Sequence, residues 1–250
     1  MKNIISKTEL LYKKSIPLDH LDLTQAINLM VNEQKKAALE VKKSIVPIEL
    51  AINKIVQHLK LYKTGRIIYL GAGTSGRIGL QDGVELIPTF NWPKDRLDYI
   101  IAGGAEAIFK AIENAEDDIL SAEKIVNQKV ICEKDIVIGI AASGNTPFTC
   151  KALETSFQRD ALTIAISNNP SGQILRFGKV NIILNTQEEV IAGSTRLKAG
   201  TAQKICLNII SSMVMAKMGR VKNGLMSDMV PTNQKLRNRK KSYNINNQKF

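Results

Sequence analysis

Five short apolar runs, separated by segments of helical composition, constrain the fold of this chain more than any other feature of its sequence. The runs are Ile67 to Leu70, Tyr99 to Ala102, Ile136 to Ala141, Leu162 to Ser167 and Val180 to Leu184. Continuous apolar runs of this length are typical of parallel strands buried on both faces. The segments Ala105 to Val126 and Pro147 to Arg159 have helical composition. The alternation predicts an α/β fold with a doubly wound parallel five-stranded sheet flanked by helices.

Helical periodicity continues on both sides of the predicted sheet. Apolar residues recur at three- and four-residue spacing through residues 22–62, and again in a long helix after Ser194. The broad apolar face of that helix, from Ile205 to Met218, is typical of a core or a subunit interface. We therefore divide the chain into an N-terminal helical segment (1–62), a main domain (63–229) and a C-terminal tail (230–250).

The charge of the chain is concentrated in its tail. The formal net charge is +12. The basic residues after position 233, with no acid among them, are Lys235, Arg237, Arg239, Lys240, Lys241 and Lys249. Such a run is typical of a poorly ordered, solvated terminus, so we expect neither nucleic acid nor membrane as a partner. The start of the chain lacks the apolar core of a secretory signal, which favours a cytoplasmic location.

Two loops that follow predicted strands share a chemistry suited to phosphate. They are Gly73-Thr74-Ser75-Gly76 and Ser143-Gly144-Asn145-Thr146, each where a helix begins. Helix N-termini offer free N–H groups and a partial positive charge, and Ser or Thr adds a hydroxyl donor. A dinucleotide site would also require an acid at the end of the second strand, which here ends in Ala102-Gly103-Gly104. The pattern favours a phosphorylated small molecule over a dinucleotide.

Several stretches, in order along the chain, resemble one known family. They are GRIIYLGAGTSGRIG (65–79), PTF (88–90), AGG (102–104), ENAEDD (113–118), AASGNTP (141–147) and EVIAGSTRLKAGTAQK (189–204). In these stretches the chain is similar to the N-acetylmuramic acid 6-phosphate etherases, which have the sugar isomerase (SIS) fold. The likeness runs from about Thr8 to Arg239 and implies that residues 63–229 form a SIS sugar-phosphate domain.

The resemblance implies a reaction and a set of residues. The family converts N-acetylmuramic acid 6-phosphate and water into N-acetylglucosamine 6-phosphate and D-lactate, by elimination and then addition of water, with no metal or organic cofactor. Glu85 matches the acid that protonates the departing ether oxygen, and Glu116 matches the base. The implied substrate-binding residues are Gly73, Thr74, Ser75, Gly76, Ser143, Gly144, Asn145, Thr146, Glu189, Ser194 and Lys198. A homodimer is implied as well, with the apolar face from Ile205 to Met218 near its interface.

The chemistry implied by the resemblance needs two carboxyl groups in different surroundings. A glutamate of ordinary pKa is almost fully ionised at pH 7, so an acid that protonates the leaving oxygen must be desolvated. The apolar neighbours of Glu85, namely Val84, Leu86, Ile87 and Phe90, predict such surroundings. Glu116 stands among acids and polar residues, which suits an ionised base.

Three departures from the family pattern keep other functions open. Val84 replaces a hydroxyl-bearing residue, Asn145 stands where the family usually has arginine, and a helical C-terminal segment of the family is not recognisable beyond Arg239. One alternative is a non-catalytic sugar-phosphate-binding regulator, or a degenerate etherase. Another is an aldose–ketose isomerase of the same fold, which would abstract the same C2 proton but release no lactate.

Overall fold

The computed structural model describes residues 8, 10–12, 16–229, 234, 237 and 238. A five-stranded parallel sheet with strand order β2-β1-β3-β4-β5 forms its centre. The strands are β1 (Ile67–Gly71), β2 (Leu97–Ile101), β3 (Ile136–Ala141), β4 (Leu162–Ser167) and β5 (Val180–Ile183). Each strand overlaps one predicted apolar run, and the predicted fold class is confirmed.

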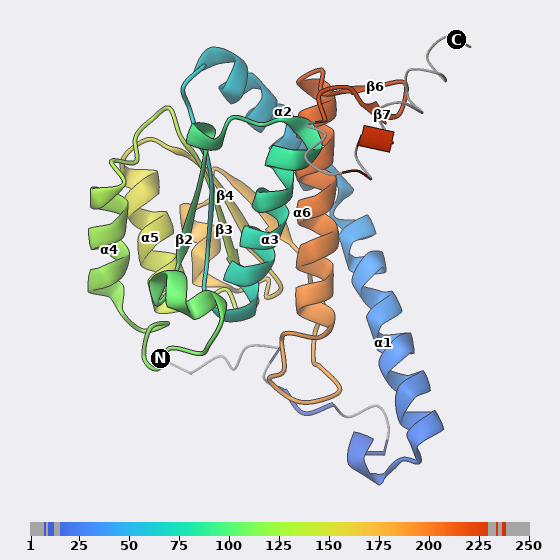
Figure 1. Ribbon diagram of the computed structural model, residues 1–250. Coiled ribbons are helices and arrows are strands. Elements are labelled where there is room, and N and C mark those ends of the chain that lie inside the picture. Colours follow the sequence, from blue (N-terminus) through green and yellow to red (C-terminus); the bar gives the residue numbers. More distant parts are fainter. Residues whose placement is uncertain (1–7, 9, 13–15, 230–233, 235–236, 239–250) are drawn as a thin grey trace.

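Helices cover both faces of the sheet (Figure 1). On one face lie α4 (Ile119–Gln128) and α5 (Pro147–Gln158). On the other lie α2 (Ile45–Leu61) and α3 (Gly73–Phe90), with α6 (Lys198–Lys217) packed against both and α1 (Leu23–Lys43) packed on α6. The smaller elements are the 3-10 helices η2 (Leu18–His20), η3 (Lys94–Arg96), η4 (Gly104–Ile108) and η5 (Gln173–Phe177), and a hairpin of β6 (Val221–Lys222) and β7 (Leu225–Met226).

Alternate residues of strands β1 to β4 supply two separate hydrophobic clusters, whereas β5 contributes Val180 and Ile182 to one of them only. In β1, Ile67 and Tyr69 join the cluster formed with α2, α3 and α6, whereas Ile68 and Leu70 join the cluster formed with α4 and α5. All five residues of β1 are buried. This double burial explains why the strands are continuous apolar runs rather than alternating ones.

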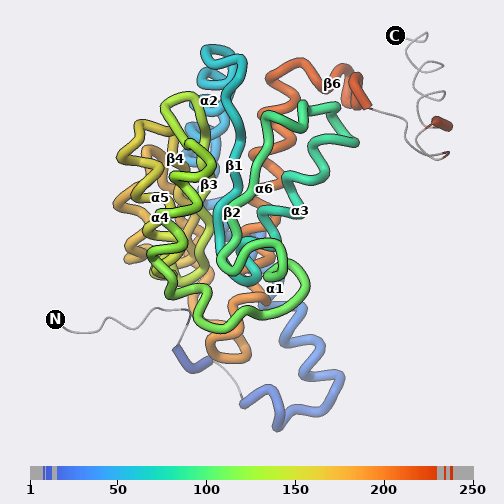
Figure 2. The backbone as a smooth tube through the Cα atoms, turned by 60° about the vertical axis from the view of Figure 1, so that its left-hand side comes forward, coloured from blue at the N-terminus to red at the C-terminus, as the bar shows by residue number. Residues whose placement is uncertain are grey.

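The N-terminal helices belong to the same core as the sheet. The Asp22 carboxylate caps α1 by accepting a hydrogen bond from the backbone N–H of Gln25 at 2.8 Å. The chain turns at Ser44, whose hydroxyl donates to the carbonyl of Ile183 at 2.6 Å and fixes α2 against β5. The N-terminal part of α1 continues past the end of the sheet, as the turned view of Figure 2 shows. Within the described part of the chain, no helix combines the length and the apolar character that crossing a bilayer requires.

The prediction of a helix over residues 105–126 is wrong for the first half of that stretch. That stretch begins with η4, continues through turns, and becomes α-helical only at Ile119. Asn114 has a positive φ of 57°, which interrupts a helix, and the Asp118 carboxylate caps α4 by accepting from Ser121 N at 2.9 Å. Glu116 therefore lies on a loop rather than on an acidic helix. The predicted tail lies outside the described residues, apart from 234, 237 and 238.

Candidate sugar-phosphate site

A polar cavity of about 460 Å³ opens at the carboxyl ends of the strands, where β1 and β3 lead into helices on opposite faces of the sheet. Ligands of doubly wound folds bind at this switch point. The lining residues are Ala72, Gly73, Thr74, Ser75, Arg77, Ala102, Ala107, Lys110, Ala111, Ile112, Ala115, Glu116, Ala142, Ser143, Thr146, Gly193 and Thr195. Both predicted phosphate loops and one of the two predicted catalytic glutamates thus meet in one cavity.

The first loop forms the N-terminus of α3. Gly73, Thr74 and Ser75 line the cavity, while Gly76 packs behind them, against Gly71. The first α3 amide that donates to the chain within this turn is that of Gly76, which reaches Ala72 O at 3.1 Å. The earlier amides of a helix have no partner within it, and here they stand at the cavity wall beside two hydroxyl side chains. This arrangement suits an anion.

The second loop contributes two hydroxyl residues to the cavity lining, but not the side-chain amide of Asn145. Ser143 and Thr146 line the cavity. Gly144 is buried, and it packs so closely against Gly172 and Ser167 that an added side chain would collide with them. The Asn145 side chain is held elsewhere: its Oδ1 accepts a hydrogen bond from Gln173 N at 3.0 Å. The structure therefore separates Asn145 from the groups that line the cavity.

Glu116 reaches the cavity because its loop is tied to α5. The backbone N–H of Phe148, in the first turn of α5, donates to the Glu116 carbonyl at 2.9 Å. The Glu116 carboxylate lies beside Gly73 at the start of α3. A carboxylate and the hydroxyl residues of both loops are thereby brought together from three segments of the chain.

Glu85, in contrast, lies far from the cavity of its own chain. It is exposed on α3, eleven residues after Thr74, which corresponds to about 16 Å along a helix axis. The expected apolar surroundings are not found within one chain, because Leu86 and Phe90 face the core while Val84 is 46% exposed beside Glu85. Helical geometry is the reason: residues adjacent in sequence point in different directions around the helix.

The segment before α6 is divided between the cavity and the interior. Gly193 and Thr195 line the cavity. Ser194 is half-buried and does not line it. Glu189 and Lys198 are 1% and 3% exposed and contact other parts of the fold rather than the cavity's polar groups. Three of the predicted binding residues thus do not line the cavity, and two of them, Glu189 and Lys198, are held by contacts within the fold.

Two basic residues at the cavity were not predicted from the sequence. The guanidinium of Arg77 donates to the carbonyls of Ala107 at 3.0 Å and Lys110 at 3.2 Å, so it holds the segment that forms the rim. The ammonium of Lys110 lies 2.6 Å from Glu106 on the same rim. One feature of the sequence could have indicated that Arg77 lies at the cavity: it follows Thr74 by three residues and so shares its face of the helix.

Candidate metal-ligating side chains and the cysteines are dispersed in the part of the chain that is described. It contains no group of three or more His, Cys, Asp or Glu side chains arranged to hold an ion. Cys150 and Cys206 are buried and Cys132 is half-buried, all of them as free thiols. Burial raises the pKa of Cys150 to about 11 and that of Cys206 to about 12, which suits inert core thiols.

The sequence of the chain is similar to those of known sugar-phosphate proteins. The sequence model of the glucokinase regulatory protein N-terminal SIS domain matches residues 49–157. The chain is 41% identical, over 93% of its length and 76% of the relative, to the N-acetylmuramic acid 6-phosphate etherase of Deinococcus radiodurans. It is 42% identical to the etherase of the same name from Bacillus thuringiensis subsp. konkukian, over 94% of its length and 79% of the relative.

Solved structures support the same fold. A phosphoheptose isomerase from Francisella tularensis superimposes with a TM-score of 0.61 at 19% identity, over 78% of this chain and all of the isomerase chain. A putative phosphosugar isomerase from Bacteroides fragilis gives a TM-score of 0.60 at 16% identity, over 81% of this chain and 94% of that chain. Similarity at this level of identity establishes the fold.

Proposed function

Since the chain belongs to the N-acetylmuramic acid 6-phosphate etherase family, we propose that it cleaves the D-lactyl ether of N-acetylmuramic acid 6-phosphate. The products are N-acetylglucosamine 6-phosphate and D-lactate, and the reaction is a carbon–oxygen lyase step followed by addition of water. We assign the enzyme to the recycling of cell-wall sugars in the cytoplasm. The observation that carries the proposal is the meeting of Glu116 with two hydroxyl-bearing helix N-termini in one cavity.

The phosphate group is bound at the two loops. Thr74 and Ser75 offer hydroxyls and backbone N–H groups at the start of α3, and Ser143 and Thr146 offer hydroxyls before α5. Two helix N-termini that converge on one point favour a dianion more than either does alone. The sugar then extends across the cavity toward Glu116.

Glu116 serves as the base in this proposal. The ring-opened sugar carries an acidic proton at C2, next to the aldehyde, and a carboxylate placed in the cavity can remove it. The electron pair left at C2 expels lactate from C3, and the C–O bond breaks as its oxygen is protonated. Water then adds at C3 of the unsaturated aldehyde, and C2 regains a proton.

In this proposal the acid, Glu85, comes from another copy of the chain. Glu85 is exposed and about 16 Å along α3 from Thr74, too far to protonate a sugar held at the phosphate loops of the same chain. A homodimer would supply it, and would also bury Glu85, which a neutral acid requires. An apolar cavity of about 480 Å³ between α1, α2 and α6, bordered by the exposed residues Ile45, Ile209 and Met213, gives such a dimer a surface to form on.

Lactate release tests the function directly. Incubation of the protein with N-acetylmuramic acid 6-phosphate in doubly labelled water should yield lactate, with solvent oxygen at C3 and solvent hydrogen at C2 of the sugar. Glu116→Ala should abolish both labels. Glu113→Ala is the matched control, because Glu113 is exposed on the same loop but does not line the cavity. Binding of the substrate without lactate would instead identify a regulator, and a ketose product would identify an isomerase.

A further inference from the structure

A buried ion pair joins the start of α6 to the N-terminal helix α1. The ammonium of Lys198 lies 2.8 Å from Oε2 of Glu33, and the two side chains are 4% and 5% exposed. The same ammonium donates to the backbone carbonyl of Glu188 at 2.8 Å. The two charged residues are 165 positions apart in the sequence, so the pair forms only when α1 has packed on α6.

Lys198 also follows directly on a segment that forms one wall of the polar cavity at Thr74, Ser143 and Glu116, called the sugar-phosphate cavity below. Residues 188–197 connect the end of the sheet to α6, and Gly193 and Thr195 of this segment line the cavity. At its other end, the Glu189 carboxylate accepts hydrogen bonds from the backbone N–H groups of Lys198 at 3.1 Å and Ala199 at 2.8 Å. The segment is therefore closed into a loop by contacts that converge on Lys198.

Glu33 gathers several donors that keep it charged. Burial by itself would raise the pKa of Glu33, but hydrogen bonds from Lys198, Lys36 and Tyr12 outweigh it and lower the pKa to about 2. The hydroxyl of Tyr12 lies 2.8 Å from Oε1 of Glu33. An ion pair with this much burial is strongly destabilising when one partner is removed, because the other charge is left without compensation.

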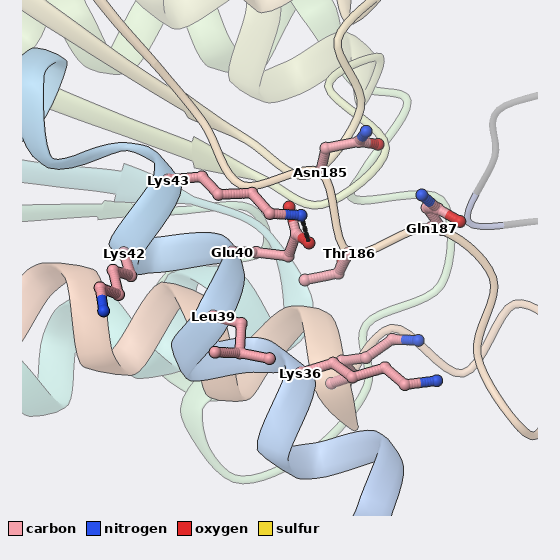
Figure 3. Close-up of a pocket in the computed structure, with 9 residues that line it drawn as sticks. Lys36, Leu39, Glu40, Lys42, Lys43, Asn185, Thr186 and Gln187 are labelled. Carbon is pink, nitrogen blue, oxygen red and sulfur yellow. Dashed lines mark hydrogen bonds and ion pairs between the residues drawn. The ribbon is translucent and has the colours of Figure 1, made fainter.

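The surroundings explain why Lys198 is unsuited to binding substrate directly. It borders a second cavity, of about 560 Å³, between α1 and the turn at residues 185–187, shown in Figure 3. The other lysines of this cavity lie at its surface, where Lys43 pairs with Glu40 at 2.6 Å. Lys198 is instead enclosed, and two of its three donor positions are taken by Glu33 and the Glu188 carbonyl.

We propose that Glu33 and Lys198 are positioning residues, which hold the segment 188–197 in place as a wall of the sugar-phosphate cavity. The inference rests on the proposed function for its effect on substrate, but not for its effect on the segment itself. Without the pair, the segment loses its anchor to α1, and Gly193 and Thr195 no longer stay at the cavity. Substrate binding should weaken while the carboxylate of Glu116, on a different segment, keeps its position.

A double-mutant cycle separates this role from direct contact with substrate. We expect Glu33→Gln and Lys198→Met each to raise KM about 10- to 100-fold, with a smaller change in kcat. The double variant should raise KM no further than the worse single variant, because the two residues act as one unit. Lys198→Arg, which keeps the cation, should recover part of the loss. If Lys198 bound the substrate itself, Lys198→Met would raise KM whereas Glu33→Gln would leave it unchanged, and the proposal would fail.

Lys36 provides the matched control. It pairs with the same carboxylate of Glu33, but its side chain is 43% exposed, whereas that of Lys198 is 4% exposed and also donates to the Glu188 carbonyl. Lys36→Ala should leave KM near the wild-type value, and a loss equal to that of Lys198→Met would overturn the proposal.

Hydrogen exchange without substrate gives a second measurement. Amides of residues 188–197 should exchange faster in Glu33→Gln and in the double variant than in the wild type, while those of α5 should not change. The double variant removes both charges of the pair, so neither partner is left without the other, and it remains available if a single variant fails to fold. Unchanged exchange in this segment would refute the anchor. Faster exchange in a protein whose wild type releases no lactate would support the anchor and count against the proposed function alone.

Discussion

The carboxylate of Glu116 lies against the backbone of Gly73, so closely that a Cβ atom built on Gly73 would be 2.9 Å from Oε1 of Glu116. The contact joins the loop after η4 to the N-terminus of α3. It brings the proposed base next to the proposed phosphate site, and it gives the glycine of the first loop a role beyond turn geometry. The first prediction follows from this contact.

Gly73→Ala should disable the base while leaving the fold in place. The methyl group would displace the carboxylate, and we expect kcat to fall about 10- to 100-fold. Gly73 also has a positive φ of 50°, so alanine adds backbone strain of roughly 1–2 kcal/mol. Gly104→Ala is the control, since Gly104 has a φ of 68° and nothing within 4 Å of an added Cβ. It should lower the thermal stability but not kcat; an equal loss of kcat in both variants would assign the effect to strain.

Mixing two inactive variants should restore activity if each site uses both chains. Glu85→Gln and Glu116→Gln homodimers should each release almost no lactate. After subunit exchange, half of the dimers are heterodimers with one intact site, which predicts about a quarter of the wild-type rate. The lactate assay before and after mixing checks this. No recovery, with exchange demonstrated by differently tagged subunits, would place Glu85 and Glu116 in the same chain's site.

A charge on the apolar face of α6 should separate the subunits. Met213 is 45% exposed beside the apolar cavity, and Met213→Asp would place a carboxylate in the proposed interface. We expect a monomer in sedimentation at micromolar concentration, and a loss of activity because Glu85 is no longer supplied. Leu120→Asp is the control: Leu120 is 76% exposed on α4, on the opposite face of the sheet. A dimer that withstands Met213→Asp would locate the interface elsewhere.

Replacement by phenylalanine should have different effects on stability at Tyr69 and at Tyr99, two stacked tyrosines under α3. The Tyr69 hydroxyl donates to the buried Asp82 carboxylate at 2.8 Å, whereas the Tyr99 hydroxyl is buried without a hydrogen-bond partner in the described part of the chain. Tyr69→Phe should destabilise the protein by about 1–3 kcal/mol, because it removes a donor from a buried carboxylate. Tyr99→Phe should be neutral or slightly stabilising. Urea unfolding of both variants checks the difference, and equal effects would contradict the assigned hydrogen bond.

The ion pair of Glu33 should make the free energy of unfolding depend on pH in the acid range. The pKa of Glu33 is about 2 in the folded chain, below the ordinary value of 4.5, so its contribution is complete above about pH 4.5 and is lost as the pH falls toward 2. The double variant Glu33→Gln/Lys198→Met should therefore lose stability less steeply than the wild type across this window. Urea unfolding at a series of pH values measures the slopes. Glu106→Gln, which removes an exposed ion pair, should follow the wild-type curve.

The sheet could be predicted from the sequence because its signal is local. A strand buried on both faces, such as β1 or β3, needs consecutive apolar residues, and all five predicted apolar runs became strands. The place of Gly73-Thr74-Ser75 at a strand-to-helix turn could be predicted for the same reason, and the structure puts these residues at the start of α3 on the cavity wall. The prediction of a helix before Ile119 was wrong because it rested on composition alone. Composition does not reveal that Asn114 adopts a left-handed conformation or that Asp118 caps the helix start.

The surroundings of the charged residues were decided by tertiary packing. Apolar neighbours in sequence suggested a desolvated Glu85, but α3 turns those neighbours toward the core and leaves Glu85 exposed. A lysine at a helix start suggested a group facing ligand or solvent, but α1 covers Lys198 and pairs it with Glu33. The sequence determined which strands form and where the glycine- and hydroxyl-rich loops lie, since those depend on neighbouring residues. Only the folded chain decided which charges are buried, paired or free, because burial depends on segments that are distant in the sequence.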